Sequence, residues 1–264
     1  TTLEGAQAKG ETVIADIGRD LTLTSQQDTS EYERRDQSAG IDVAVGMGGS
    51  SVSGNYSQSS IDSTYTSVRE QTGIQAGDGG FDITVGGNTQ LTGAAIASTA
   101  DPSRNRLSTG SLSATDLENR AAYEAESFSI SGGTSGGGGN PWSGGVSPGL
   151  GVSQDESIGS TTRSGISAGT IEIRDGDESA LANLDRSVTE LQQDGLRDIF
   201  DLQRVQERME MGQVAGEVGF QAAGDLAGRM GWEEGSPERA ALHGLVGAGM
   251  AALGGGNALQ GATG

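Results

Sequence analysis

The residues best suited to nucleophilic chemistry are a serine and a histidine far apart in the chain. Ser167 stands in GISAG, residues 165–169, which fits the G-x-S-x-G pattern, and His243 is the single histidine. With an intervening Asp, their order would be that of a serine hydrolase. The pentapeptide GIQAG, residues 73–77, matches GISAG but has Gln75 in place of the serine. Because this internal copy lacks a nucleophile, we interpret the glycines as turn residues and predict no catalytic residue.

The single histidine also limits metal chemistry. His243 is flanked by Leu242 and Gly244 in an apolar stretch, which favours a packing role for its ring. The chain has no cysteine, so a zinc site would need carboxylates as its other protein ligands, which is uncommon. No G-x-x-x-x-G-K-[ST] loop is present to hold a nucleotide. We therefore predict no metal-binding residue and no cofactor.

Acidic turns leave calcium as an alternative. Their carboxylates are those of Asp78 and Asp82 in GDGGFD, and of Asp175, Asp177 and Glu178 in RDGDE. Neither segment fits an EF-hand loop or a G-G-x-G-x-D repeat. Solvated turns in which Asp serves its turn propensity are the favoured interpretation.

The composition excludes a broad core of large side chains. Of 264 residues 46 are Gly, 4% are aromatic and 33% are hydrophobic. Stacked short coils suit such a chain, because each coil needs few inward Val, Ile and Leu residues. The net charge of −20 and the single lysine, Lys9, make nucleic acid a poor partner. The absence of cysteine excludes disulfides and is compatible with export of an unfolded chain.

Internal repeats organise the first two thirds of the chain. VGGNTQLTG, residues 85–93, aligns with IGRDLTLTS, residues 17–25, at an offset of 68, while GIQAG and GISAG are 92 residues apart. Repetition of this kind predicts stacked β coils. The coil strands are expected around Val13, Ile17, Leu21 and Leu23, with a turn at Gly18, and again over 81–97 and about 106–118.

Two insertions interrupt the coil. After the charged residues 28–37, which lack a burial pattern, apolar residues alternate with small or polar ones at Ile41, Val43, Val45 and Met47, and return at Ile61, Tyr65 and Val68. This pattern predicts a long antiparallel hairpin over 38–72. A second insertion over 123–166 contains residues 131–151, which are too Gly-rich to order themselves without a partner. Such hairpins either seal a sheet edge or enter a membrane.

Beyond Asp177 the apolar period changes to about 3.6. The resulting helical stripe contains Leu181, Leu184, Val188, Leu191, Ile199, Leu202, Val205 and Met209. We expect two helices or one kinked helix here, broken at Gly195.

Small residues dominate the end of the chain. Gly212 with Gly216, and Gly224 with Gly228, have the small-xxx-small spacing that predicts close helix contact. The uncharged residues 240–264 have marginal apolarity for a membrane span. A packed helical hairpin is the favoured interpretation, and membrane insertion is the alternative.

The repeats resemble those near the C-terminal end of filamentous-haemagglutinin exoproteins of Gram-negative two-partner secretion, in particular contact-dependent growth-inhibition toxins. RAALHGLVG followed by LGGGN resembles the pretoxin region of the same exoproteins. We therefore predict a mainly β protein. A right-handed parallel β-helix (β-solenoid) with long hairpin excursions would occupy 1–176, and a pretoxin-like helical segment 177–264.

The resemblance implies a secreted, cell-surface segment that helps deliver a C-terminal toxin across the target bacterium's outer membrane. Its implied partners are an outer-membrane two-partner secretion transporter and the target cell's outer membrane or a surface receptor. No Val-Glu-Asn-Asn motif is present and no signal peptide starts at Thr1, so we expect an internal piece. Toxin and immunity protein would then be engaged only by parts absent from this chain. A passive adhesin stalk is the alternative, and a serine hydrolase the remote one.

Overall fold

A computed structural model describes the chain except residues 47–48, 138–139, 177, 234–235 and 254–264. The described part is mainly β, as predicted. By contact density the chain divides into two units. The coil unit contains Thr1–Ser30, Tyr65–Ala121 and Ile158–Asp198, and the hairpin–helix unit contains Glu31–Thr64, Ala122–Ser157 and Ile199–Gly264.

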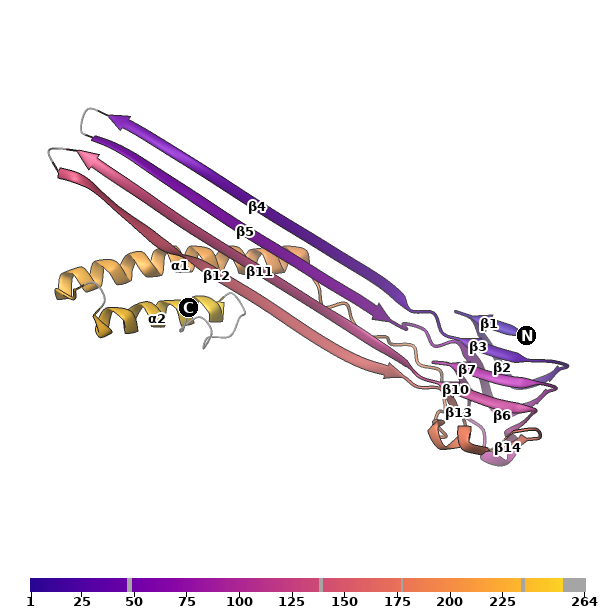
Figure 1. The fold of residues 1–264 in the computed structure, drawn as a ribbon. Coiled ribbons are helices and arrows are strands. Elements are labelled where there is room, and N and C mark those ends of the chain that lie inside the picture. Colours follow the sequence, from indigo (N-terminus) through magenta and orange to yellow (C-terminus); the bar gives the residue numbers. More distant parts are fainter. Residues whose placement is uncertain (47–48, 138–139, 177, 234–235, 254–264) are drawn as a thin grey trace. The chain divides into compact units, whose positions relative to one another are not determined.

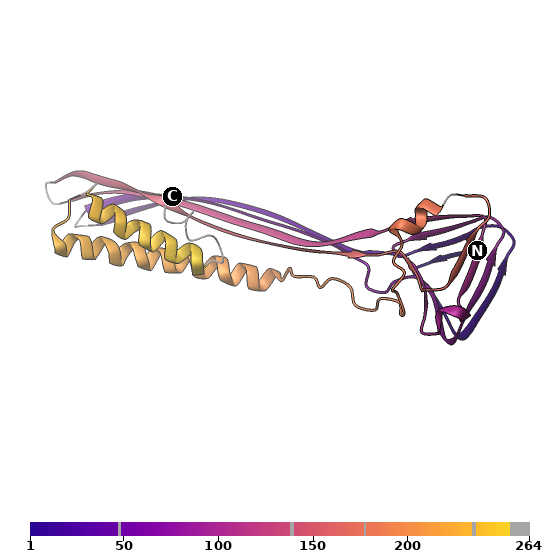
Figure 2. The same ribbon diagram turned by 90° about the horizontal axis from the view of Figure 1, so that it is seen from below.

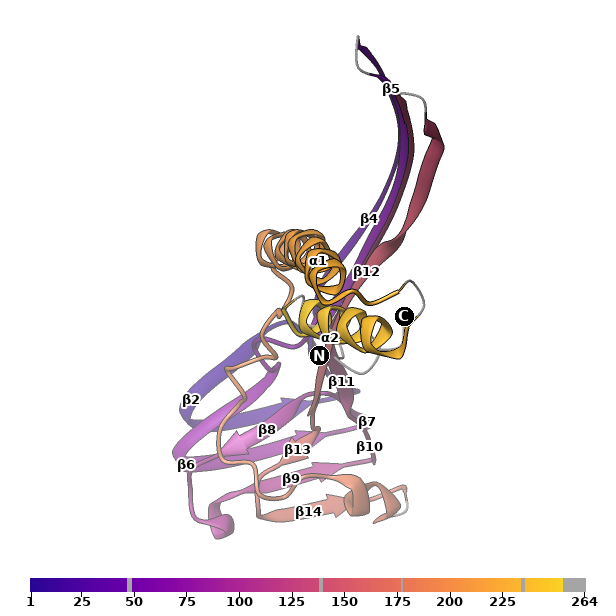
Figure 3. The ribbon, with the colours of Figure 1, turned by 90° about the vertical axis from the view of Figure 1, so that its left-hand side faces the viewer.

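The coil unit is built from two parallel sheets (Figure 3). The first sheet has the order β1 (Thr2–Glu4), β3 (Leu21–Thr24), β7 (Asn88–Thr92) and β10 (Ser111–Thr115). The second contains β2 (Gln7–Ile17), β6 (Gly73–Val85), β8 (Ala95–Ser98), β9 (Arg106–Thr109), β13 (Gly165–Ile166) and β14 (Thr170–Ile173). Apart from the hairpin strands, each strand of the first sheet is followed along the chain by one or two strands of the second sheet. The chain thus makes four successive rungs.

The strand register confirms the internal repeats. Ile17 pairs with Val85 and Leu23 with Leu91, which is the offset of 68 found in the sequence. Gly73 and Gly165 both pair with Ala95, so GIQAG and GISAG occupy equivalent places on either side of β8. Parallel stacking puts like residues above one another, which is why the sequence repeat predicts the register.

The core of the coil unit lies between the sheets. Its largest buried side chains are Leu21, Leu23, Phe81, Ile83, Val85, Leu91, Ile96, Leu107 and Ile166. Each rung supplies a few of them, and each such side chain contributes about 1.5–3 kcal/mol on burial. A single large aromatic residue, Phe81, is among them, as the composition requires.

Both predicted hairpins are present. The first consists of β4 (Asp28–Gly46) and β5 (Gly49–Ser67), and the second of β11 (Leu117–Gly137) and β12 (Asn140–Thr162). They follow β3 and β10, two equivalent strands of the first sheet, and return to GIQAG and GISAG. Figure 1 shows that neighbouring hairpin strands run in opposite directions, in the order β12-β11-β5-β4.

The hairpin strands differ from expectation at two places. Residues 28–37 belong to β4 although they have no burial pattern, because all of them but Tyr32 are exposed. The glycine-rich residues 131–137 lie in β11. There β11 lies between β12 and β5, and a Cβ built on Gly133 would lie 3.3 Å from Ser53 of β5.

The helical stripe predicted from Leu181 to Met209 is α-helical only from Leu202 on, so the prediction is wrong for residues 184–201. A 3-10 helix, η2 (Glu178–Asn183), is followed by irregular chain up to α1 (Leu202–Met230) and then α2 (Pro237–Leu253). The Asp201 side chain accepts a hydrogen bond from Arg204 N at 3.1 Å and caps α1, which fixes the helix start. Gly231, with φ of 71°, ends it in the left-handed conformation that glycine tolerates best.

The two helices lie side by side (Figure 2). A Cβ built on Gly219 would lie 2.7 Å from Val246 Cγ1, so this glycine permits the close approach. The rings of Phe220 and His243 meet edge to face at 5.4 Å. The close contact predicted at Gly224 and Gly228 is not found among the described residues, since a Cβ on either would meet none of their atoms within 4 Å.

Candidate functional site

The serine of GISAG has a structural role. Ser167 is 3% exposed, its Oγ accepts a hydrogen bond from Ser98 N at 2.7 Å, and it donates to the Val188 carbonyl. Gln75 occupies the equivalent place in GIQAG. Its Oε1 accepts from Leu191 N at 2.9 Å and its Nε2 donates to the Thr189 carbonyl at 3.0 Å. Both side chains therefore hold the same irregular segment.

We call this segment, residues 185–196, the strap. At one end Ile166 N donates to the Asp185 carbonyl at 3.0 Å. In the middle Gln71 N donates to the Gln192 carbonyl at 2.9 Å, and Gln71 Oε1 accepts from Gln192 N at 3.1 Å. At the other end Leu196 N donates to Ser67 Oγ at 2.8 Å. The strap thus crosses from β13 past β6 to the end of β5.

Small residues make room for the strap. Leu191 is buried against Ala95 and Ala97. A Cβ on Gly73 would lie 2.6 Å from Leu191 Cδ2, and one on Gly195 would lie 2.6 Å from the Val68 carbonyl oxygen. Gly195, predicted as a helix break, is instead the point where the strap passes the Val68 backbone.

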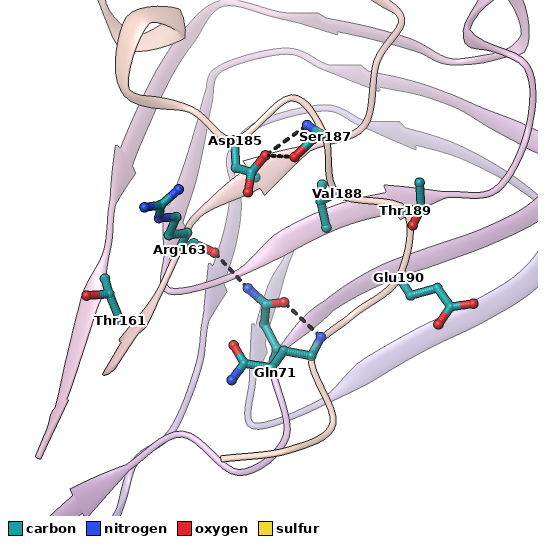
Figure 4. Close-up of a pocket in the computed structure, with 10 residues that line it drawn as sticks. Gln71, Thr161, Arg163, Asp185, Ser187, Val188, Thr189 and Glu190 are labelled. Carbon is teal, nitrogen blue, oxygen red and sulfur yellow. Dashed lines mark hydrogen bonds between the residues drawn. The ribbon is translucent and has the colours of Figure 1, made fainter. Parts of the chain in front are cut away.

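A polar pocket beside the strap lacks catalytic geometry. Arg163, Asp185, Ser187 and Glu190 are among the residues that line it (Figure 4). Ser187 N and Oγ donate to Asp185 Oδ1 at 2.8 and 2.6 Å, and these hydrogen bonds lower the pKa of Asp185. Asp185 is thereby kept ionised as a turn-forming carboxylate rather than poised as a base.

His243, Asp78 and Asp82 are also engaged in packing or polar contacts. His243 packs on Phe220 in the hairpin–helix unit, whereas Ser167 belongs to the coil unit. Asp78 Oδ1 accepts from Thr99 Oγ1 at 3.0 Å, and Asp82 lies 3.6 Å from Arg106. Asp177 lies outside the described residues. Within the described ranges no three acidic, histidine or cysteine side chains come together as a metal site.

The hairpin–helix unit has a small core of its own. Ile61, Tyr123, Ala125, Val205 and Met209 are buried there. Phe200 lies between two tyrosine rings, 5.2 Å from Tyr32 and 6.1 Å from Tyr123. Burial, followed by the negative charge of Glu156, raises the pKa of Tyr123. These contacts anchor the start of α1 on the hairpin strands.

The same unit exposes large apolar side chains. In β4, Ile41, Val43 and Val45 are 79%, 65% and 83% exposed. On α1, a shallow apolar groove contains Met211, Val214 and Val218, which are 49%, 60% and 61% exposed. Of the helical stretches described, none combines the length and apolarity needed to cross a membrane. The exposed residues are the strongest candidate interaction surface, and their alternation was visible in the sequence.

Comparison with known proteins gives one family match and several similarities that extend over most of the chain. A family model described as hemagglutinin repeat matches residues 1–41. The chain is 42% identical over 240 residues to the tRNA nuclease CdiA of Escherichia coli O6:K15:H31 (strain 536 / UPEC). It is 40% identical over 245 residues to the deoxyribonuclease CdiA of Yersinia pseudotuberculosis serotype O:3 (strain YPIII) and to the toxin CdiA of Yersinia pestis.

These alignments include 88% of the chain but a small part of each relative. The chain spans 7% of the Escherichia coli protein, 22% of the Yersinia pseudotuberculosis protein and 7% of the Yersinia pestis protein. No solved structure matches the chain.

Proposed function

We propose that this chain, a haemagglutinin-repeat region of the CdiA-like exoproteins, is a non-catalytic segment that helps deliver a C-terminal toxin across the outer membrane of a target bacterium. CdiA and haemagglutinin-repeat proteins are secreted surface exoproteins. On this proposal the segment lies at the surface of the producing cell and meets the target-cell envelope during contact-dependent growth inhibition.

The observation that carries the proposal is the exposed apolar surface of the hairpin–helix unit. Val43 and Val45 on β4, and Val214 and Val218 on α1, are each at least 60% exposed. Exposed apolar side chains that gather on one unit are typical of protein or membrane interaction sites. A delivery segment that meets a target envelope needs such a surface, whereas a spacer does not.

We assign different roles to the two parts of the sequence. Residues 1–176 would form a right-handed parallel β-helix that serves as the scaffold for the hairpins. Residues 177–264 would form the pretoxin-like segment next to the toxin. The strap, which begins this second part, packs on β6, β8 and β13 and would anchor one part on the other.

The proposed partners follow from the family. They are an outer-membrane two-partner secretion transporter and the target cell's outer membrane or a receptor on it. Toxin and immunity protein would be engaged by other parts of the parent protein. The net charge of −20 disfavours nucleic acid as a partner of this segment.

A passive adhesin stalk is the second candidate. The observation in its favour is the coil unit, whose core side chains are almost fully buried and whose Ser167 and Gln75 are occupied by the strap. A stalk would need this stable coil and would make no use of the exposed apolar residues.

The experiment introduces Val214→Asp and Val218→Asp together into a parent toxin that carries this segment. We expect surface display to persist and growth inhibition of target cells to fall by a large factor, on the order of a hundredfold. Ile14→Asp is the matched control, because Ile14 is an 80% exposed apolar residue of the coil unit. Full inhibition by the α1 variant, or by a parent lacking residues 73–176, would contradict delivery and favour the stalk.

A further inference from the structure

The four-stranded hairpin sheet ends in two unequal edges. In the order β12-β11-β5-β4, the outer strands are β12 and β4. An edge strand presents unpaired backbone N–H and C=O groups, and native proteins protect such edges with charges or prolines. The two outer strands differ in this protection.

The β12 edge is protected by proline. Pro141 and Pro148 both lie within β12 and have no N–H to donate. They are seven residues apart, so their backbone nitrogens point to opposite sides of the strand. One of the two missing donors therefore belongs to the outer edge, and an added strand would lose that hydrogen bond.

The β4 edge is protected along only half of its length. Residues 31–36, EYERRD, are mostly charged, and Arg34 pairs with Asp36 at 2.6 Å. Residues 37–46, QSAGIDVAVG, contain a single charge, Asp42, and no proline. On this part Ile41, Val43 and Val45 alternate and are at least 65% exposed. In the described part of the sheet, β4 has β5 on one side and no strand on the other.

We propose that residues 37–46 of β4 form a two-fold edge-to-edge interface with β4 of a second copy of this chain. A second copy is the partner that fits, because its β4 offers a matching unprotected edge while its β12 does not. The hairpins already pair edge to edge within the chain, through β5 and β11. An isologous contact between identical edges closes on itself, so it yields a dimer and not a fibre.

The apolar pattern selects the register. In an antiparallel pairing centred on Val43, Val43 faces its own copy, and Ile41 faces Val45 of the other chain on the same face of the sheet. Asp42 then faces Ala44, so no carboxylate lies directly opposite another. Matched apolar cross-strand pairs stabilise a sheet and opposed like charges destabilise it. A register centred on Asp42 would instead oppose the two Asp42 carboxylates and place Val45 against Ala39.

The first test is the mass of the intact chain in solution. We expect a concentration-dependent dimer by sedimentation or light scattering. Val43→Lys would oppose two lysines across the two-fold axis and raise the dimer dissociation constant about tenfold or more. An equimolar mixture of Val43→Lys and Val43→Glu chains should restore pairing as a heterodimer. Val52→Lys is the control, because Val52 lies on β5, which is paired on both sides.

Cysteine cross-linking tests the register, since the natural chain has no cysteine. Opposed residues of an antiparallel pair lie within disulfide range. Val43→Cys should therefore give a covalent dimer, and Val52→Cys should not. A mixture of Asp42→Cys and Ala44→Cys chains should cross-link to each other better than either does alone.

Two results would overturn the proposal without touching the proposed function. One is a monomer at all concentrations with no Val43→Cys dimer. The other is a natural chain that stays monomeric and binds lipid vesicles, with Val43→Lys and Val52→Lys weakening that binding equally. This face would then be a lipid contact instead. The proposed function is tested separately, by the growth inhibition that remains in the variant with Val214→Asp and Val218→Asp. That result does not depend on the oligomeric state.

Discussion

The coil unit and the hairpin–helix unit use their apolar residues in opposite ways. In the coil unit Leu23, Ile83 and Leu91 are fully buried, and each is paired with apolar residues of neighbouring rungs, as Leu23 is with Leu91. In the hairpin–helix unit Ile41, Val45 and Val214 face solvent. The coil thus stabilises itself, whereas on the proposed function the second unit keeps apolar surface available for a partner.

The difference in burial between the two units is tested most strongly by replacing one isoleucine in each unit with alanine. Ile83→Ala should lower the free energy of unfolding by about 2–5 kcal/mol, because it leaves a cavity among packed neighbours. Ile41→Ala removes the same atoms from a side chain that is 79% exposed, and its effect should stay within about 0.5 kcal/mol. Urea denaturation monitored by circular dichroism measures both. Equal losses would show that the exposure of Ile41 does not hold in solution.

Replacing a glycine by alanine should lower stability in the coil unit and raise it in the hairpin–helix unit. Gly80 has φ of 74°, and a Cβ there would lie 2.5 Å from the Arg104 carbonyl oxygen, so Gly80→Ala should destabilise by about 1–3 kcal/mol. Gly224 lies within α1, and a Cβ there would meet no atom of the described residues within 4 Å, so Gly224→Ala should stabilise the helix by about 0.5–1 kcal/mol. Thermal melting provides the readout. Destabilisation by Gly224→Ala would mean that a neighbour packs against that face of α1.

Ser167→Ala separates a structural serine from a catalytic one. The substitution leaves the Ser98 N–H without its acceptor and should cost about 1–3 kcal/mol. In Ser167→Ala, amide hydrogen exchange should become faster at Ser98 and around Val188. In Gln75→Ala, amide hydrogen exchange should become faster at Leu191. A hydrolytic activity of the purified chain that disappears in Ser167→Ala would overturn the structural assignment.

Acid should loosen the strap at its Asp185 end. Hydrogen bonds from Ser187 lower the pKa of Asp185 in the folded chain. A carboxyl with a depressed folded pKa stabilises the fold above its unfolded pKa of about 3.9, and this stabilisation is lost as pH falls through the folded pKa. Hydrogen exchange of 185–188 should thus rise below about pH 4. In Ser187→Ala the transition should move to higher pH, and an unchanged profile would contradict the assigned cause.

The sequence predicts the coil well because its physical constraints are repeated. The alignment of Leu23 with Leu91 holds in the structure since parallel rungs place like side chains in one stack. Alternation at Ile41, Val43 and Val45 likewise predicts a strand, because neighbouring residues of a strand point to opposite faces. That two hairpins pair through β5 and β11 was not predictable, as nothing in either hairpin alone specifies its neighbour.

The strap shows where sequence reasoning fails. Leu184, Val188 and Leu191 have helical spacing, yet the chain is irregular there because tertiary contacts outweigh local periodicity. Leu191 finds its partners in Ala95 and Ala97, about 95 residues earlier in the chain. The one available signal was the pair Gln75 and Ser167, two polar side chains at equivalent places in a repeat, whose partners were not visible in sequence.

The most direct test of the account is flotation of the purified chain with outer-membrane vesicles, followed by protease digestion and mapping of the protected peptides. The account predicts that vesicle-bound chain is protected within 38–72, 123–166 or 240–264, and that the coil strands remain cleavable only at their loops. Recovery of all the chain in the soluble fraction, with the same cleavage pattern with and without vesicles, would contradict membrane delivery and leave the stalk.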